Sequence, residues 1–166
     1  MVDSSSARFL RYIPSNVYFR DLQIVIDETA VWLTPCQVPF DFTATAILCR
    51  VMLGSSASHI LCCIYKSDGD IPDEQPLVVK SLEYTVPSTS LTPFETNLIE
   101  VPITPTPLSK GLYWVGFQIQ EANRKSDRAS LMVAFREFVN TYGDFPAVCP
   151  ETVGTQTGFA AILKGL

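Results

Sequence analysis

The sequence predicts an all-β protein in which two antiparallel sheets pack together as a sandwich, with a jelly roll as the nearest arrangement. Three observations support this. Apolar residues recur at every second position in several short runs, turns containing Gly, Pro and Ser separate those runs, and no segment keeps the 3.6-residue period of a helix. About eight or nine short strands of this kind favour a sandwich, and a β-barrel is the alternative.

The length and composition indicate one domain that has more apolar side chains than it needs. The chain has 166 residues, which suits a single ordinary domain, and we expect residues 21–166 to form it. Hydrophobic residues make up 47% of the chain and charged residues 17%. Because a closed monomer has limited interior, we expect part of this apolar surplus to be covered by subunit contacts.

Residues 1–20 differ in composition from the rest of the chain. Serines are mixed there with arginines and aromatic residues, which suits an arm that lies on a surface; a frayed terminus is the equal alternative. The residues expected to carry docking by this N-terminal arm are Arg8, Phe9, Tyr12, Tyr18 and Phe19.

Two short strands are predicted at residues 22–26 and 29–34, on either side of a polar pair; one strand with a bend is the alternative. Residues 36–40 contain Pro39 and follow Pro35, so we expect them to form an edge or a corner. From residue 40 to residue 53 both alternating sets of positions are largely apolar, a pattern typical of a strand that is covered on both faces. We therefore expect residues 40–53 to be a central strand.

The next apolar run, residues 58–66, follows a turn at residues 54–57. A connection of this length cannot make a parallel crossover, so we expect residues 40–53 and 58–66 to pair as an antiparallel hairpin. Residues 66–76 carry two prolines and several acidic side chains, a composition that indicates a solvent-facing loop.

The middle of the chain contains the clearest strand. Residues 77–86 and 95–101 are predicted strands around a turn, and residues 101–107 contain three prolines, which predict an extended connector. A turn at Lys110 and Gly111 then leads into residues 111–120, where apolar side chains alternate with the period of a β-strand.

The last part of the sequence is less regular. Residues 121–128 are the densest charge cluster and are expected to form an exposed hairpin tip. A strand fits residues 131–135, although a helix is the alternative over so short a run. Residues 140–150 are predicted to be a loop, and a final strand is predicted near residues 158–163.

Charge and cysteine content exclude several classes of partner. The net charge of −5 opposes binding to phosphate backbones, so we expect no nucleic acid partner. No window approaches the ~20 apolar residues that cross a bilayer, and the polar start of the chain does not resemble a secretory signal. The five cysteines lack the C-x-x-C spacing of a metal site, so we expect buried thiols and no cofactor.

The sequence offers little catalytic chemistry. His59 is the single histidine, and the serines near it are explained by a turn, so we expect no catalytic residues and no enzyme activity. The loop acids Asp68, Asp70, Asp73 and Glu74 could surround a calcium ion, but the order of an EF-hand is absent and a solvated acidic turn explains the same residues.

Aromatic side chains are the remaining route to ligand binding, because sugar rings stack on them and partner proteins bury them. Each candidate is also a good core residue. Within residues 111–120, Trp114 lies on the opposite face from Tyr113 and Phe117, so one of these sets must face away from the first core. The candidate ligand-binding residues are Trp32, Tyr65, Tyr84 and Trp114, with Tyr142 as a further aromatic of the same kind.

Three motifs carry a resemblance to a known group of proteins. They are a strand that leads to the corner Pro39-Phe40, a Tyr-x-x-x-Gly segment from Tyr65 to Gly69, and a Leu-x-x-Gly-x-Tyr-Trp strand from Leu108 to Trp114. Over roughly residues 29 to 120 the chain resembles β-sandwich domains of tailed-bacteriophage virion proteins, of the fibre, tail or head-decoration type. It departs from that pattern at residues 70–73, where a Pro-Gly turn is common in the group.

The resemblance implies a non-enzymatic building block of a virion, assembled in the host cytoplasm. We expect it to self-associate, most simply as a trimer, and to dock on other virion proteins through its arm. The alternative is a carbohydrate- or receptor-binding module that recognises a cell-surface glycan.

Overall fold

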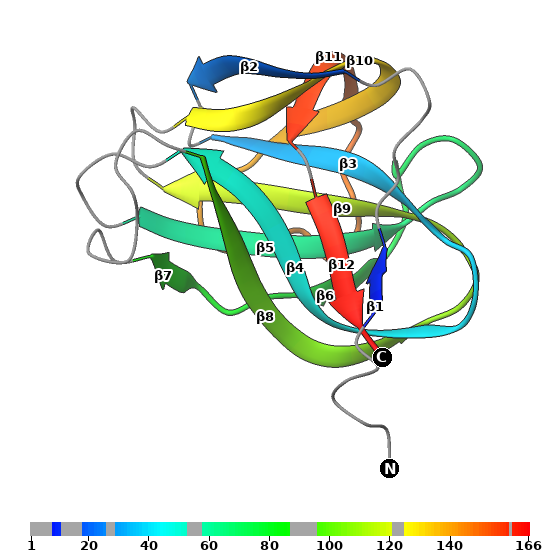
Figure 1. Cartoon of the computed structure of the whole chain (residues 1–166). Helices are drawn as coiled ribbons and strands as arrows, with labels where there is room; N and C mark the ends of the chain where they lie inside the picture. The colour runs from blue at the N-terminus through cyan, green and yellow to red at the C-terminus, as the bar shows by residue number, and fades with distance from the viewer. Residues whose placement is uncertain are drawn as a thin grey trace.

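The computed structural model describes residues 8–10, 18–25, 29–52, 58–86, 96–120, 125–159 and 161–166. It confirms an all-β protein in which two antiparallel sheets pack face to face as a sandwich (Figure 1). The strand order does not establish jelly-roll connectivity. In the part of the chain that the structure describes, no helix is long and apolar enough to cross a membrane.

Twelve strands lie in these residues, and all of their pairings are antiparallel. In chain order they are β1 (Arg8–Leu10), β2 (Tyr18–Val25), β3 (Ala30–Val38), β4 (Phe42–Met52), β5 (Ser58–Lys66), β6 (Leu77–Lys80), β7 (Tyr84–Val86), β8 (Thr96–Leu108), β9 (Gly111–Gln120), β10 (Lys125–Val139), β11 (Val153–Phe159) and β12 (Ala161–Gly165).

The two sheets differ in width. Apart from β1 and β2, the small sheet has three strands in the order β12-β4-β8, and the large sheet has seven, with β11, β10, β3, β9 and β5 in order and both β6 and β7 on the far side of β5. The expected central strand is confirmed, because β4 lies between β8 and β12. β1 pairs with β12 and β2 pairs with β10, so parts of the expected arm belong to the chain's own sheets.

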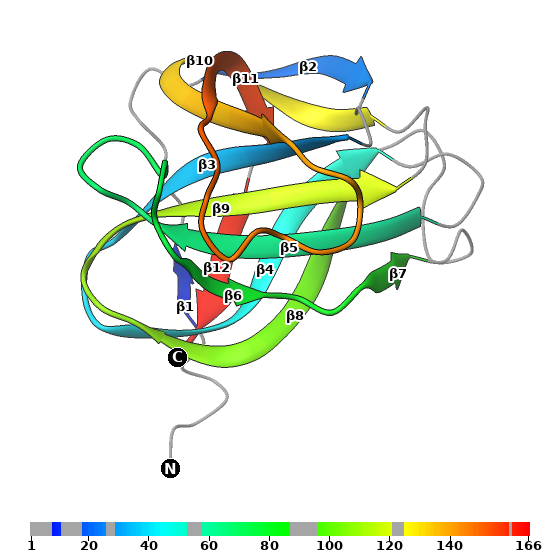
Figure 2. The same cartoon turned by 180° about the vertical axis from the view of Figure 1, so that it is seen from behind.

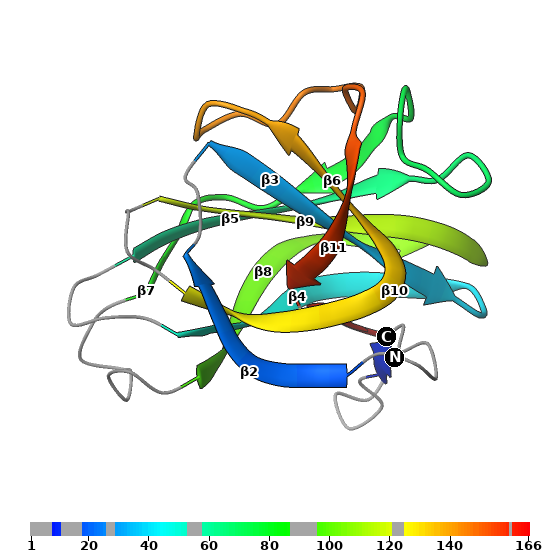
Figure 3. The same cartoon turned by 90° about the horizontal axis from the view of Figure 1, so that it is seen from above.

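The long strand β10 joins the two sheets at one end. Its residues Lys125 and Ser126 pair with Met52 and Val51 of β4, and farther along it pairs with β11, β2 and β3. Its register against β11 shifts between Ser130 and Phe135, and the strand bends strongly (Figure 3). The expected hairpin tip at residues 121–128 is therefore wrong: β10 already begins at Lys125, and β9 and β10 are not paired with each other in the described residues, which do not include 121–124.

The expected hairpin between residues 40–53 and 58–66 is also wrong. Both strands form, but β4 pairs with β8 and β12, whereas β5 pairs with β9, β6 and β7. In a sandwich, a short connection can carry the chain from one sheet to the other as well as around a hairpin. The two strands face each other across the core, and Cys49 Sγ of β4 lies 3.8 Å from Cys62 Sγ of β5.

The proline-rich segment is a strand and not a connector. Residues predicted as a strand (95–101) and a connector (101–107) together form β8, which pairs with β4. β8 is an edge strand among those described, and a proline can sit there because its missing N–H then faces the open side. The register between β4 and β8 shifts between Ala44 and Ala46.

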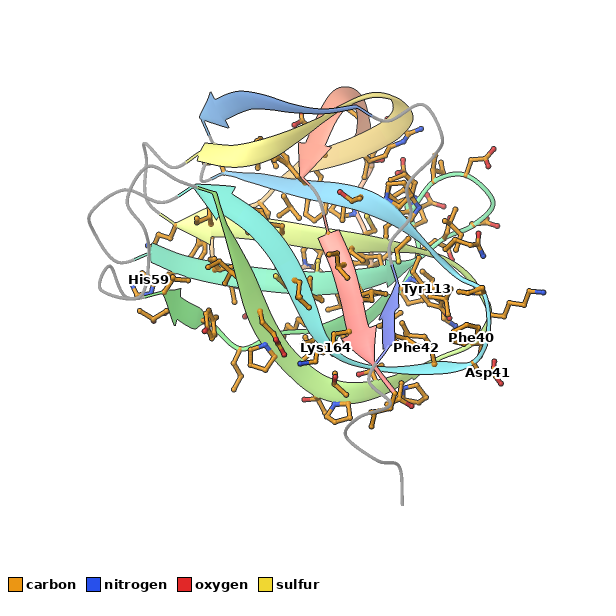
Figure 4. All side chains as sticks on the ribbon, viewed as in Figure 1. Phe40, Asp41, Phe42, His59, Tyr113 and Lys164 are labelled. Carbon is orange, nitrogen blue, oxygen red and sulfur yellow. The ribbon has the colours of Figure 1, made fainter. Side chains whose placement is uncertain are left out.

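This irregularity explains why both sets of alternating positions in β4 are apolar. Phe42 and Ala44 face the core between the sheets, and after the shift Ile47 and Cys49 face it instead. Leu48, on the outer side of β4, is also buried. Above this outer face Lys164 Nζ of β12 donates a hydrogen bond to Glu100 Oε1 of β8, at 2.8 Å (Figure 4).

The large sheet is covered on both faces. Its inner face and the small sheet enclose the first core, which includes Ile60, Val115 and Phe117. Its outer face carries a second core, which includes Trp114. Residues 140–152 lie over this second core, and we call them the cover segment. Figure 2 shows this segment crossing over β9 and β5. The second core consists of Val31, Leu33, Leu61, Cys63, Tyr65, Trp114, Phe138, Phe145 and Cys149.

Hydrogen bonds attach the cover segment to the sheet along its length. At its start, buried Gln118 donates from Nε2 to the carbonyl oxygen of Asn140, at 2.8 Å. At its end, the backbone N–H of Leu77 donates to Ala147 O and that of Cys149 donates to Gln75 O. The segment that the sequence predicts only as a loop therefore covers the apolar face that Trp114 presents.

Candidate functional site

The acidic loop after β5 lines a hollow at the surface of the described residues. The hollow has a volume of about 440 Å³ and is lined by Asp68, Ile71, Asp73, Glu74 and Glu151. The first four belong to the predicted loop at residues 66–76, and Glu151 comes from the cover segment. The structure thus brings together carboxylates that are far apart in the sequence.

Local turns determine the shape of the loop. Gly69 has a φ of 65° and allows a tight turn in which Asp68 N donates to Ile71 O. Ser67 Oγ donates to the carbonyl oxygen of Gly69, and Trp114 Nε1 in turn donates to Ser67 Oγ at 3.2 Å. The second core and the loop are therefore linked through the indole of Trp114.

Asp73 connects the two sides of the hollow. Its Oδ2 accepts from the backbone N–H of Thr152 at 3.2 Å, and its Oδ1 accepts from the Thr152 hydroxyl. Arg136 donates from Nη1 to the carbonyl oxygen of the same threonine. Asp73 is therefore engaged in holding the cover segment, which leaves Asp68, Glu74 and Glu151 as the carboxylates that can accept hydrogen bonds from a ligand.

The chemistry of the hollow suits a ligand with several hydroxyl groups. Carboxylate oxygens accept hydrogen bonds strongly, and sugar hydroxyls are matching donors. Within the described ranges, no set of three or more His, Cys, Asp or Glu side chains is grouped as a metal site would require.

His59 lies at the other end of the sandwich from Phe40 and Asp41 (Figure 4). Its Nδ1 is 3.1 Å from Thr85 Oγ1 and 3.3 Å from Glu83 Oε1. A hydrolytic triad needs the acid and the nucleophile on opposite nitrogens of the ring, whereas both groups here meet the same nitrogen. This arrangement orients the imidazole against β7, and among the side chains that the structure describes it does not form a triad.

The aromatic candidates from the sequence are mostly core residues. Tyr65 and Trp114 are buried in the second core, and Trp32 is buried in the first. Tyr84 is half-buried against the first core, and Tyr142 is packed against the second. Burial and the negative charge of Glu83 raise the pKa of Tyr142 above its ordinary value. These positions assign packing roles, and the prediction of ligand binding stays a prediction.

The docking arm lies partly in the described strands. Arg8 and Phe9 belong to β1, and Tyr18 and Phe19 belong to β2, while Tyr12 lies outside the described residues. The backbones of these strands pair with β12 and β10. The prediction that their side chains dock on another protein is untested.

Sequence reasoning missed an apolar surface at the rim of the sandwich. Val139 and Val153 are 83% and 63% exposed. Val153 pairs with Glu137, and Glu137 pairs with Trp32, whose ring lies in the core between the sheets. Paired residues point to the same face of a sheet, and so do residues two positions apart on one strand, such as Glu137 and Val139. Both valines therefore lie on the inner face of the large sheet. Because the small sheet is narrower, it leaves this part of the face open. We call Val139 and Val153 the valine ledge.

Comparison with known proteins does not assign the chain to a family. No protein-family model matches the chain, and no curated protein matches it. The resemblance to phage virion proteins therefore depends on the three sequence motifs alone.

Proposed function

We propose that this chain is a non-enzymatic structural component of a phage virion, of the head-decoration, fibre or tail type, that acts by self-association and by docking on other virion proteins. The observation that carries the proposal is the valine ledge, which leaves two apolar side chains in water on neighbouring strands. The β-sandwich fold is also the one that the resemblance to virion proteins implies.

A second copy of the chain is the partner that we assign to the ledge. Covering a valine that water surrounds stabilises a contact by about 1.5–3 kcal/mol. The ledge adjoins the rim of the first core, so a neighbouring copy there would extend an apolar region that already exists. In a trimer, which we favour, each ledge would contact the next copy in the ring.

The self-association is tested by size-exclusion chromatography with light scattering. We expect an oligomer for the natural chain and a monomer for the double variant Val139→Ser/Val153→Ser. The matched control is Leu82→Ser, which removes an 89%-exposed apolar side chain from a different surface and should leave the oligomer intact. A stable monomer of the natural chain at high concentration would contradict self-association.

The virion role is tested separately. Mass spectrometry of purified phage particles from the source of this gene should detect the chain in a fixed ratio to the major capsid protein. Its absence from intact particles would contradict the virion role, whatever the oligomeric state.

A second candidate function, carbohydrate binding, is favoured by the hollow of about 440 Å³ beside the acidic loop. A glycan array with the natural chain should show saturable binding that is lost in Asp68→Asn/Glu151→Gln. Asp144→Asn is the control, because Asp144 is an exposed carboxylate that forms an ion pair with Lys80 outside the hollow. A silent array would contradict this function.

A further inference from the structure

Two buried thiols meet between the sheets of the sandwich. Cys49 lies on β4 of the small sheet and Cys62 on β5 of the large sheet, and neither side chain is exposed. Their sulfur atoms are 3.8 Å apart. All five cysteines of the chain are described, and all of them are thiols.

The other three cysteines are placed differently. Cys63 and Cys149 belong to the second core, on the outer face of the large sheet. Cys36 is in the first core on β3, which is a strand of the large sheet. Cys49 is therefore the cysteine of the small sheet, and a bond between Cys49 and Cys62 would join one sheet to the other.

We propose that Cys49 and Cys62 are a modification site at which an intersheet disulfide forms when the chain meets an oxidising environment. For this bond the sulfur atoms must approach from 3.8 Å to about 2.05 Å, through rotation of the two side chains and movement of the sheets toward each other. A disulfide through the core between two sheets is compatible with a β-sandwich, because antibody domains contain one.

The reaction is a thiol–disulfide exchange with a low-molecular-weight disulfide as the oxidant. The thiolate of one cysteine attacks a sulfur of the reagent, forms a mixed disulfide and releases one reagent thiolate. The second cysteine loses its proton and attacks the protein sulfur of the mixed disulfide, which releases the other reagent thiolate. The two protein thiols are oxidised to one disulfide, the reagent is reduced to two thiols, and the protons pass to the departing thiolates.

Burial determines the rate of this reaction. Desolvation and the neighbouring Cys49 raise the pKa of Cys62 well above its ordinary value, so the thiolate is scarce in the closed sandwich. Reagent and thiolate meet when the sheets open locally. The reaction is therefore slow. Its product stabilises the folded chain, because the new bond restricts the conformations that the unfolded chain can adopt.

The test starts from the purified, reduced full-length chain, incubated with oxidised 2-mercaptoethanol under native conditions. Thiols are then counted in denaturant. The natural chain should lose two of its five thiols and keep no bound reagent, whereas Cys49→Ala and Cys62→Ala should form no protein disulfide and should each lose at most the one remaining thiol, as a mixed disulfide whose added mass identifies it. Cys63→Ala is the control, because its thiol faces the second core, and it should lose the same two thiols as the natural chain.

Two further measurements use the natural chain and do not depend on how the variants fold. Peptide mapping should locate the disulfide between Cys49 and Cys62, and the urea midpoint of the oxidised chain should rise and return when a reductant is added. Five thiols after prolonged oxidation, a disulfide mapped to another pair, or an unchanged or lower urea midpoint would overturn the proposal.

Discussion

The hydroxyl of Tyr65 donates a hydrogen bond to the carbonyl oxygen of Pro146, at 2.7 Å. This bond joins a central strand of the large sheet to the cover segment, 81 residues later in the sequence. The ring of Tyr65 also meets Phe138 edge to face, with centroids 6.2 Å apart. One side chain thus fixes the cover segment by both its polar and its apolar part.

The first prediction separates these two contributions. Tyr65→Phe removes the hydrogen bond and keeps the ring, so it should lower the free energy of unfolding by about 1 kcal/mol. Tyr65→Ala also removes the ring and should cost about 3–5 kcal/mol. Urea denaturation measures both values. Equal losses in the two variants would show that the ring contributes nothing.

The second prediction concerns the close packing of β9 against β5. A Cβ at Gly116 would overlap Cys63 Sγ and lie 3.0 Å from Leu33 Cδ2, so Gly116→Ala should destabilise the chain by about 1–3 kcal/mol. Adding Cys63→Ala should recover part of the loss, because it removes the overlapping sulfur. Gly154→Ala is the control, since nothing lies within 4 Å of its Cβ position, and urea midpoints compare all of the variants.

The third prediction tests the link between the acidic loop and the cover segment. Asp73→Ala removes the acceptor of both the N–H and the hydroxyl of Thr152, so we expect a loss of about 1.5–3 kcal/mol. Hydrogen exchange should accelerate at Thr152. Asp70→Ala, a change in an exposed residue of the same loop, is the control and should leave the Thr152 exchange rate unchanged.

The strands could be predicted from the sequence because the period of two is a local property. The central position of β4 was also predictable, since apolar residues on both faces require cover on both sides. The strands with which β4 and β5 pair could not be predicted, because a short connection is compatible with a hairpin and with a crossing between sheets. The same connection length allows both arrangements, and only the whole core decides between them.

The candidate site was predictable only in part. The acidic loop at residues 66–76 was expected to face solvent, and it lines the hollow. Glu151 joins it from the cover segment, which the sequence marks only as a loop. The burial of Tyr65 and Trp114 has the same cause, because no local pattern indicates that residues 140–152 fold back over the large sheet.

The fourth prediction is a loss of stability at alkaline pH. Burial raises the pKa of Cys36 from 9.0 to about 12. The folded chain therefore keeps this proton above pH 9 while the unfolded chain releases it, so the free energy of unfolding should fall between pH 9 and pH 12. One shielded thiol contributes up to about 1.4 kcal/mol per pH unit. Burial shifts the pKa of Cys149 in the same direction.

Urea denaturation at pH 7, 8, 9 and 10 measures this slope. The contribution of these thiols to the free energy of unfolding should be constant up to about pH 8 and should fall beyond pH 9. Cys36→Ala should reduce the slope above pH 9, even if its stability at pH 7 is lower. An identical slope in the variant and the natural chain would contradict the role of Cys36.

The edge strand β8 limits how copies of the chain can add to one another. Proline has no N–H to donate, and β8 contains Pro102, Pro105 and Pro107, of which Pro102 and Pro107 are paired with residues of β4. A further strand that approached this edge would find gaps in the ladder, so growth of a continuous intermolecular sheet, the route to amyloid-like fibrils, is blocked there. If copies associate through side chains as we propose, this edge adds no competing route to endless polymerisation.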